Sequence, residues 1–292
     1  MQKRVTVAIC TYNRCQSLQK TLESVFAQIT DFAFGILVVD NASTDGTQEA
    51  IRSIQNAPIP VDYVLESQQG ITFARNRALD AVTTPFIAFI DDDEIVEPGW
   101  LAALIGAFDV AKPTPSVVGG QLRIKWTQQQ PSWMPDELLG MLGRLDYGSN
   151  LKIVKMVNSG NFAFPIELAR AYRFNTSLGL FGNQQNPGED AEILRRIRRN
   201  GGLVYYQPAA VVTHIVGQAR ESRAYLYSRS RAQGHQDAII SVINPWPGRR
   251  QILWLMAKDA FNRRHWWKRI FLNAISLKLA KDIRERTWTR AV

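Results

Sequence analysis

The sequence predicts an α/β fold with a mostly parallel central sheet flanked by helices. Up to residue 108, short apolar and β-branched runs alternate with segments whose apolar residues recur at helical spacing, an order that produces parallel strands joined by crossover helices. Polar clusters follow directly after successive strands, and in such sheets the carboxyl ends of the strands line the ligand crevice. The 292 residues, 46% of them hydrophobic, suffice for one large domain or a domain with an appendage.

The amino-terminal part divides into four strands and four helices. The first strand is mostly apolar and β-branched, and the next segment places Leu18, Leu22 and Val25 on one helical face. A turn-rich cluster follows the second strand and separates it from the next helix. We expect strands at 5–10, 35–39, 61–65 and 86–90, and helices at 17–29, 48–55, 72–82 and 99–108.

The following part has a less regular pattern. Residues 111–150 contain Pro, Gly, Gln and Trp without a sustained period, so we expect one strand followed by a loop. Gly201 and Gly202 end a helix, because glycine tolerates the backbone conformation found after helix C-termini. We expect strands at 117–126, 153–165, 203–206 and 210–214, and helices at 166–172 and 189–200.

The most informative stretch is the acidic run that follows the strand at 86–90. Asp91, Asp92, Asp93 and Glu94 are consecutive, and such like charges are costly unless a cation lies among them. Hard divalent ions take carboxylate oxygens, and a magnesium-type ion combines one or two of them with substrate phosphates. The run therefore predicts a site for a metal and a phosphorylated ligand. The alternative is an acidic loop that caps the next helix.

Two further polar clusters end strands of the predicted sheet. Thr11 and Tyr12 follow the first strand, and Asp40 and Asn41 follow the second. A nucleotide could use these positions together with the acidic run, with Tyr12 as a stacking face and Asp40 as the acceptor for a base N–H. The sequence has neither G-x-G-x-x-G after the first strand nor a Walker A loop, which disfavours a dinucleotide fold and a P-loop nucleotidase.

Four other residues admit a functional and a structural interpretation. Glu189 and Asp190 stand at a predicted helix start, where a carboxylate can serve as a general base or simply cap the helix. His214 ends a strand and is either structural or a third metal ligand. Arg75, near another helix start, can meet a phosphate or lie on a solvated helix face.

The positive charge of the chain is concentrated in its last quarter. Residues 1–219 hold 19 Lys and Arg against 21 Asp and Glu, and residues 220–292 hold 16 against 5, which gives net charges of −2 and +11. Trp side chains accompany these cations, and a basic amphipathic helical region of this kind can lie on anionic lipid. The alternative is helices that dock on the preceding α/β domain with a solvated basic face. No recognised nucleic-acid-binding module accompanies the charge, so we expect no nucleic-acid partner.

The composition also indicates in which part of the cell the protein acts. The two cysteines, Cys10 and Cys15, are too few for a disulfide framework and fit a reducing cytosol. The start of the chain shows no secretory signal, and no apolar stretch approaches the ~18–20 residues of a membrane-spanning helix. We expect a cytoplasmic protein, with peripheral attachment to the inner face of the plasma membrane as an open alternative.

Seven short segments, in this order, carry a resemblance to a known family. They are ICTYNR at 9–14, VVDNASTDGT at 38–47, ARN at 74–76, FIDDD at 89–93, GN at 160–161, GED at 188–190 and PAAVVTH at 208–214. The chain resembles family 2 glycosyltransferases, the large inverting group with the GT-A fold, from about residue 4 to 240. The run of acids and the segment from Trp126 to Met134 look closest to bacterial exopolysaccharide glucosyltransferases of the succinoglycan type.

The resemblance implies donor and metal roles. Asp40 would bind the uracil ring with Tyr12 packing nearby, and Asp92 would contact the ribose. Asp93 would hold Mg²⁺ or Mn²⁺ bridging the donor diphosphate, and His214 would assist at the metal or the diphosphate. Two positions depart from the family pattern, Asn41, where a second Asp is common, and Cys10. The implied nucleotide-sugar-binding residues are Thr11, Tyr12, Asp40, Arg75, Asp91 and Asp92.

The resemblance also implies the acceptor chemistry and the division of the chain. Asp190 would deprotonate the acceptor hydroxyl with support from Glu189, and the acceptor side would include Trp133, Gly160 and Asn161. The predicted domains are a catalytic domain at 1–219 and a basic amphipathic helical region at 220–292. The nucleotide-binding half of the catalytic domain is about 1–110 and its acceptor half about 111–219.

The expected function is that of a metal-dependent inverting hexosyltransferase. It would move a sugar from a nucleotide sugar, a UDP-hexose, to a saccharide acceptor that is lipid-linked, in polysaccharide biosynthesis. Two rival interpretations remain open at this point. One is an aspartate-dependent phosphohydrolase, which the order of residues around Asp91 fits poorly, and the other is a non-catalytic sugar-nucleotide or glycan-binding module.

Overall fold

The computed structural model describes residues 2–54, 57–134, 136–181, 184–186, 188–226, 228–229 and 232. The chain splits into two compact units, Met1–Thr176 with Glu189–Gly217 and Ser177–Gly188 with Gln218–Val292. No helix among the described residues is long and apolar enough to cross a membrane. The predicted basic region at 220–292 lies almost entirely outside the described residues, so its membrane or docking role stays a prediction.

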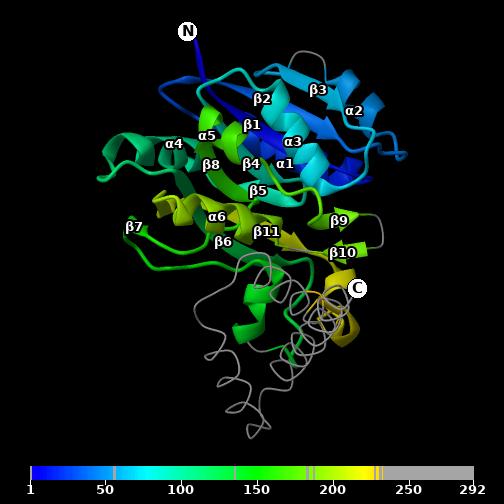
Figure 1. The fold of residues 1–292 in the computed structure, drawn as a ribbon. Coiled ribbons are helices and arrows are strands. Elements are labelled where there is room, and N and C mark those ends of the chain that lie inside the picture. The colour runs from blue at the N-terminus through cyan, green and yellow to red at the C-terminus, as the bar shows by residue number, and fades with distance from the viewer. Residues whose placement is uncertain are drawn as a thin grey trace, which may run out of the picture. The chain divides into compact units, whose positions relative to one another are not determined.

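The amino-terminal half of the first unit is a parallel sheet in the order β3-β2-β1-β4 (Figure 1). The strands are β1 (Lys3–Thr11), β2 (Ala33–Asp40), β3 (Val61–Leu65) and β4 (Phe86–Asp91). β1 and β2 are buried along most of their length, as expected for parallel strands that helices cover on both faces. All four strands agree with the sequence prediction to within two residues.

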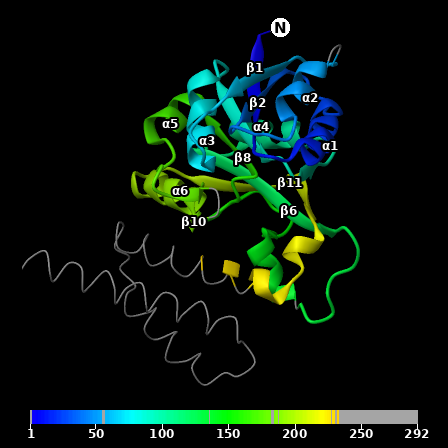
Figure 2. The same ribbon diagram turned by 90° about the vertical axis from the view of Figure 1, so that its right-hand side faces the viewer.

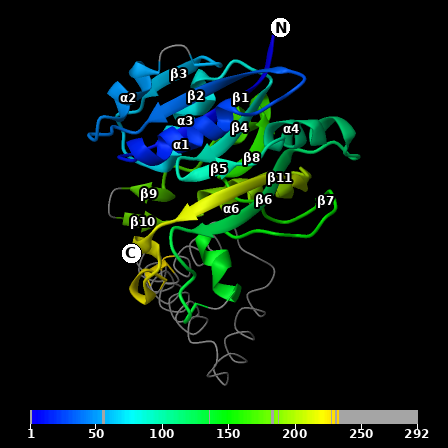
Figure 3. The same ribbon diagram turned by 180° about the vertical axis from the view of Figure 1, so that it is seen from behind.

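The sheet continues beyond β4 with strands of mixed direction (Figure 3). β8 (Asn161–Pro165) pairs antiparallel with both β4 and β6 (Val117–Trp126). β6 is parallel to the long strand β11 (Val204–Val216), and β11 pairs antiparallel with β5 (Glu94–Val96) and β7 (Lys152–Ile153). The predicted α/β fold with a large central sheet is confirmed, and the sheet is mixed in its second half.

Helices cover both faces of this sheet and divide its core into two layers. Side chains alternate along β1, with Val5, Val7 and Ile9 in one layer and Ala8 and Cys10 in the other. The first layer is covered by α1, α2 and α4 and the second by α3, α5 and α6; Figure 2 shows α1 and α2 on one side of the sheet and α3 and α5 on the other. The helices are α1 (Cys15–Phe26), α2 (Thr47–Ser53), α3 (Ile71–Ala81), α4 (Trp100–Val110), α5 (Ile166–Tyr172) and α6 (Glu189–Arg199).

Three details of the second half differ from the sequence prediction. The predicted strands 203–206 and 210–214 are one strand, β11, whose register with β6 shifts between Gln207 and Val211. The predicted strand at 153–165 is paired only at its two ends, in β7 and β8. The short strand β5, the 3₁₀ helix Asp136–Leu142 and, in the second unit, the hairpin of β9 (Gly179–Phe181) and β10 (Gln184–Asn186) were not expected from the sequence.

The irregularity in β11 is fixed by one buried amide. The Nδ2 atom of Asn161 donates to the carbonyl oxygens of Gln121, 2.9 Å away, and Ala210, 2.8 Å away. Its Oδ1 accepts from the indole Nε1 of Trp100 at 2.8 Å. The Ala210 carbonyl lies where a side chain on Gly120 would begin. A bulged strand can therefore pass over β6 only if β6 carries glycine at this position.

We expect Gly120→Ala to destabilise the protein by about 2–3 kcal/mol or to prevent folding, because its Cβ would overlap a backbone carbonyl that cannot move without breaking the sheet. Gly106→Ala is the matched control. Gly106 lies within α4 with open space around its missing Cβ, so alanine there should stabilise the protein by ~0.5–1 kcal/mol. Urea unfolding measures both changes, and equal stability of the two variants would contradict the role given to Gly120.

Candidate functional site

The polar clusters predicted at the strand ends meet at one edge of the sheet. Thr11 at the end of β1 is aligned with Asp40 at the end of β2. On its other side, Cys10 of β1 is aligned with Asp91 at the end of β4. Three segments that are far apart in sequence therefore deliver their polar side chains to the same place, as the alternation of strands and helices predicts.

Arg14 holds the acidic turn between β4 and β5. Its Nη1 donates to Asp92 Oδ1 at 2.9 Å and to Asp93 Oδ2 at 2.7 Å. The second oxygen of Asp92 accepts from the Thr11 hydroxyl at 2.7 Å. Asp92 is 5% exposed, and this burial raises its pKa to about 6, although the charge of Arg14 acts in the opposite direction. The cation that the acidic run requires is thus supplied by the chain itself in this structure.

A histidine and an aspartate face each other beside this turn. His214 Nε2 lies 3.5 Å from Asp93 Oδ2. The other ring nitrogen, Nδ1, donates to the carbonyl oxygen of Leu142 at 2.8 Å, and in this tautomer Nε2 is the nitrogen whose lone pair can bind a metal. A carboxylate oxygen and an imidazole lone pair then point to the same region, and a backbone carbonyl orients the ring, as is usual for metal-ligating histidines.

This pair is smaller than a complete metal site. Among the described residues, no group of three or more His, Cys, Asp or Glu is arranged to hold a metal ion. A magnesium-type ion keeps only one or two protein carboxylates when substrate phosphates supply the remaining ligands. Asp93 and His214 therefore fit a divalent ion that binds together with a diphosphate, and they do not fit a preformed metal cage.

Asp40 is the most enclosed of the predicted nucleotide-binding residues. It is 1% exposed, and its oxygens accept from the backbone N–H of Ser43 at 2.9 Å and from the hydroxyl of Tyr63 at 2.8 Å. Burial and the hydrogen bond to Asp40 raise the pKa of Tyr63 to about 12. Tyr12, in contrast, is 41% exposed, so its ring is available for stacking.

Asn41, the departure from the family pattern, organises the neighbouring loop. Its Nδ2 donates to the carbonyl oxygens of Glu66 at 3.1 Å and Gln68 at 2.8 Å, and its Oδ1 accepts from the N–H of Gly70 at 2.7 Å. Gly70 directly precedes α3. The amide of Asn41 can donate and accept at once, which a carboxylate cannot do, and this sets the start of the helix that carries Arg75.

Arg75 joins the donor edge of the sheet to the start of α6. Its guanidinium donates to Glu189 Oε1 at 2.8 Å and Asp91 Oδ1 at 3.2 Å. Helix α6 begins at Glu189, and Asp190 lies in its first turn, where its Oδ1 accepts from the backbone N–H of Ala191 at 2.7 Å. Arg75 thus links Glu189 to Asp91 of the acidic cluster, and Asp190 is the next residue of the helix.

Comparison with known proteins identifies the chain. The sequence profile described as Glycosyl transferase family 2 matches residues 6–172, more than half of the chain. The chain belongs to glycosyltransferase family 2. This confirms the family resemblance drawn from the seven motifs and favours the transferase over the phosphohydrolase and the non-catalytic module.

Curated relatives and a solved structure extend the assignment. The glucosyl-dolichyl phosphate glucuronosyltransferase of Haloferax volcanii is 26% identical over 252 residues, 83% of this chain and 79% of that one. The succinoglycan biosynthesis protein ExoM of Rhizobium meliloti is 28% identical over 241 residues, 79% and 72% of the two chains. The mannosyltransferase PcManGT from Pyrobaculum calidifontis, solved with GDP-Man and Mn²⁺, matches with a TM-score of 0.62 and 20% identity, covering 97% of this chain and 88% of that one. The last likeness shows the GT-A fold.

The predicted acceptor-side residues of this glycosyltransferase lie in different surroundings. Asn161 is completely buried, and its hydrogen bonds to Trp100 and to two backbone carbonyls hold the sheet together. Gly160 lies against the carboxyl of Glu94, which occupies the place of a Cβ atom at this position. Trp133 is partly exposed in the segment before the 3₁₀ helix. Contact of any of them with an acceptor stays a prediction.

Two residues, Arg14 and Glu94, have roles in this site that the sequence pattern did not predict. Arg14 enters the sequence prediction only as the last residue of the segment ICTYNR at 9–14, although the run of acids calls for a nearby cation. Glu94 is 2% exposed and accepts from the N–H of Asp91 at 3.3 Å. Burial, followed by the charges of Asp91 and Asp93, holds its pKa well above the usual range. Val96, which shares a face of β5 with Glu94 and is buried, was the available signal that Glu94 points inward.

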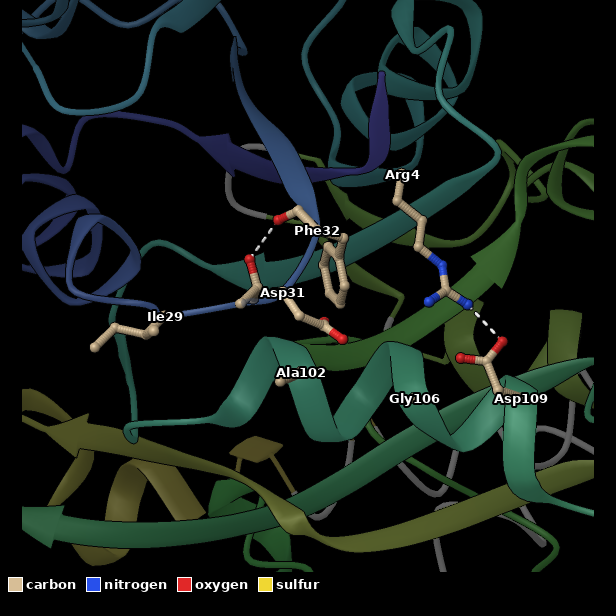
Figure 4. Close-up of a pocket in the computed structure, with 8 residues that line it drawn as sticks. Arg4, Ile29, Asp31, Phe32, Ala102, Gly106 and Asp109 are labelled. Carbon is tan, nitrogen blue, oxygen red and sulfur yellow. Dashed lines mark hydrogen bonds and ion pairs between the residues drawn. The ribbon is translucent and has the colours of Figure 1, made fainter. Parts of the chain in front are cut away.

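A separate pocket lies away from this cluster (Figure 4). It is lined by residues of β1, α4 and the segment before β2, and none of the predicted site residues lines it. The Arg4 guanidinium lies 5.5 Å from the centre of the Phe32 ring and pairs with Asp109 at 2.5 Å. These contacts tie the start of β1 to α4, and we assign this pocket no part in the chemistry.

We expect Arg14→Gln to destabilise the metal-free enzyme by about 1–2 kcal/mol near pH 8, because it leaves buried carboxylate charge without its cation. Arg14 lowers the pKa of Asp92, so the loss should shrink toward about pH 5, where Asp92 is protonated in both proteins. Urea unfolding across this pH range measures it. Arg144→Gln, which breaks an exposed ion pair with Asp136, serves as control, and a loss independent of pH would contradict the account.

Proposed function

We propose that this glycosyltransferase is a metal-dependent inverting hexosyltransferase that uses a nucleotide sugar, a UDP-hexose, and a lipid-linked saccharide acceptor. The observation that carries the proposal is the pairing of Asp93 with His214 at 3.5 Å, beside the strand ends that a nucleotide would occupy. Relatives in glycan biosynthesis and a solved relative of the same fold that holds Mn²⁺ support it.

Asp93 and His214 would hold Mg²⁺ or Mn²⁺, with the donor diphosphate completing its coordination. When bound, the ion supplies Lewis-acid neutralisation of the charge that develops on the leaving nucleotide diphosphate. Arg14 bonds Asp93 Oδ2, which is also the oxygen that lies near His214. Its guanidinium would therefore have to turn away or share this carboxylate when the ion binds. The side chain of Arg14 is 40% exposed and that of Asp93 16%, so solvent reaches the ion pair at which this exchange would take place.

The strand ends would bind the nucleoside part of the donor. Tyr12 offers an exposed ring on which a base can stack. Asp40 would accept from a base N–H, and the hydrogen bonds from Ser43 and Tyr63 fix the orientation of its carboxylate in advance. Asp92 would contact the ribose while Thr11 holds its other oxygen. Asp91 would complete this side from the end of β4.

Asp190 would act as the general base. A carboxylate that takes the proton from the acceptor hydroxyl on the face opposite the leaving group gives a single displacement with inversion, as in inverting glycoside hydrolysis. Glu189 precedes it and is bound by Arg75, so its role would be to support the base. Acceptor specificity would depend on the segment around Trp133.

The name of one relative supports the proposed acceptor, and the charge of residues 220–292 supports the proposed location. The name of the Haloferax volcanii relative includes a dolichyl-phosphate-linked sugar, which favours a lipid-linked acceptor here too. The basic residues 220–292, with a net charge of +11, would bring the enzyme to an anionic membrane surface on the cytoplasmic side.

We expect the full chain to bind UDP with Mn²⁺ far more tightly than without it, and Asp93→Ala to abolish this difference, because a carboxylate ligand is lost. Calorimetric titration of UDP and GDP, each with and without Mn²⁺, measures it. Asp31→Ala, an exposed residue before β2, is the matched control and should bind like wild type. Binding of both nucleotides that is indifferent to Mn²⁺ would exclude the metal-dependent mechanism.

We expect Asp190→Asn to reduce sugar transfer by at least about 100-fold, because the amide cannot accept the acceptor proton. Its affinity for UDP in the presence of Mn²⁺ should stay within about threefold of wild type. Transfer of radiolabelled sugar from the nucleotide sugar measures the first value, and calorimetry measures the affinity for UDP. Retained transfer would remove Asp190 from the role of base, and lost nucleotide affinity would reassign it to the donor site.

A further inference from the structure

We propose that Arg75 is a positioning residue that fixes the Glu189–Asp190 pair relative to the donor edge of the sheet. The inference deepens the proposed function and rests on it for the catalytic roles of Asp190 and the strand ends. It differs from the sequence prediction, which put Arg75 in contact with the nucleotide.

The contacts of Arg75 join three parts of the fold. Nη1 donates to Glu189 Oε1 at 2.8 Å. Nη2 donates to Asp91 Oδ1 at 3.2 Å and to the hydroxyl of Ser159 at 3.0 Å. The guanidinium also lies 5.5 Å from the centre of the Phe174 ring, which limits the planes that it can adopt. One side chain of α3 therefore connects the end of β4 with the first residue of α6.

Burial makes this bridge rigid. Arg75 is 3% exposed, so water does not compete for its hydrogen bonds. A guanidinium in such surroundings requires acceptors at fixed places, since an unpaired buried charge is strongly unfavourable. Glu189 and Asp91 meet this requirement from positions 114 and 16 residues away in sequence.

The bridge sets the position of the proposed base. Asp190 follows Glu189 in the first turn of α6, and neighbouring helical residues keep a fixed angle to each other. Holding Glu189 therefore also fixes the backbone of Asp190 relative to Asp91. The planar fork of arginine can bind two carboxylates with separate N–H groups in fixed directions, whereas lysine offers a single rotating ammonium.

The same geometry argues against a direct contact with the donor. Both terminal nitrogens of Arg75 already bond to protein acceptors, and its surface is almost entirely covered. A phosphate could reach the guanidinium only after displacing Glu189 or Asp91. Donor binding and base positioning therefore predict different consequences of the same substitution.

The test uses the full chain with Arg75→Lys and, as matched control, Arg77→Lys, an exposed arginine on the same helix. The probe is whichever of UDP-glucose, UDP-glucuronic acid and GDP-mannose the wild type binds with Mn²⁺. Calorimetry gives the donor Kd, and release of the nucleoside diphosphate at saturating donor, with water as acceptor, gives the turnover. We expect Arg75→Lys to lower turnover about 10- to 100-fold with Kd within about threefold. Arg77→Lys should change neither.

Two outcomes would overturn the inference. A Kd weakened tenfold or more with turnover retained would make Arg75 a donor ligand, and unchanged values of both would leave it no role. Should Arg75→Lys fail to fold, Glu189→Gln tests the same contact from its other side, since the amide oxygen still accepts while the charge is lost. It should show the same split between turnover and Kd, and a full turnover would again contradict the proposal.

A further measurement separates this inference from the proposed function. If the wild type binds none of the three nucleotide sugars with Mn²⁺, the proposed donor chemistry fails. Hydrogen–deuterium exchange then still tests the bridge, because Arg75→Lys should speed exchange in the peptide that covers α6 while Arg77→Lys leaves it unchanged. Equal exchange in both variants would show that Arg75 does not hold α6.

Discussion

The concentration of negative charge at the end of β4 is the constraint on which the rest of the site depends. Three consecutive aspartates lie there, and two arginines, Arg14 before α1 and Arg75 in α3, compensate them. Arg14 bonds Asp92 and Asp93 from the exposed side, and Arg75 bonds Asp91 from the buried side. The charge balance of the acidic turn is thus divided between an accessible cation, Arg14, and an enclosed one, Arg75.

This division suggests how one turn can serve both binding and catalysis. The accessible part, Asp93 with His214, faces the region where a metal and a diphosphate would enter. The enclosed part reaches through Arg75 to Glu189, and so to the residue proposed as base. The sheet makes both possible because β8, inserted antiparallel next to β4, carries Asn161, whose amide anchors β6, β11 and α4 around the site.

The sequence predicted the amino-terminal half of the fold well because β1, β2 and β4 are almost continuously buried and α1 is amphipathic, so local pattern and tertiary structure agree. It predicted the meeting of Thr11, Asp40 and Asp91 for the same reason. It could not predict that β11 continues through its bulge, since the bulge depends on Gly120 and Asn161, which are distant in sequence. The sequence could not predict the ion pair of Arg75 with Glu189 either, because the two residues are 114 positions apart.

The central claim is that the acidic turn binds a divalent ion together with a nucleoside diphosphate. A crystal structure of the enzyme with Mn²⁺ and UDP tests it most directly, through the anomalous signal of manganese. We expect a single strong peak in direct coordination with Asp93 and the diphosphate, near His214, with the Arg14 guanidinium moved off Asp93 Oδ2. A diphosphate bound at these strand ends without manganese, with Arg14 still on Asp93, would contradict it.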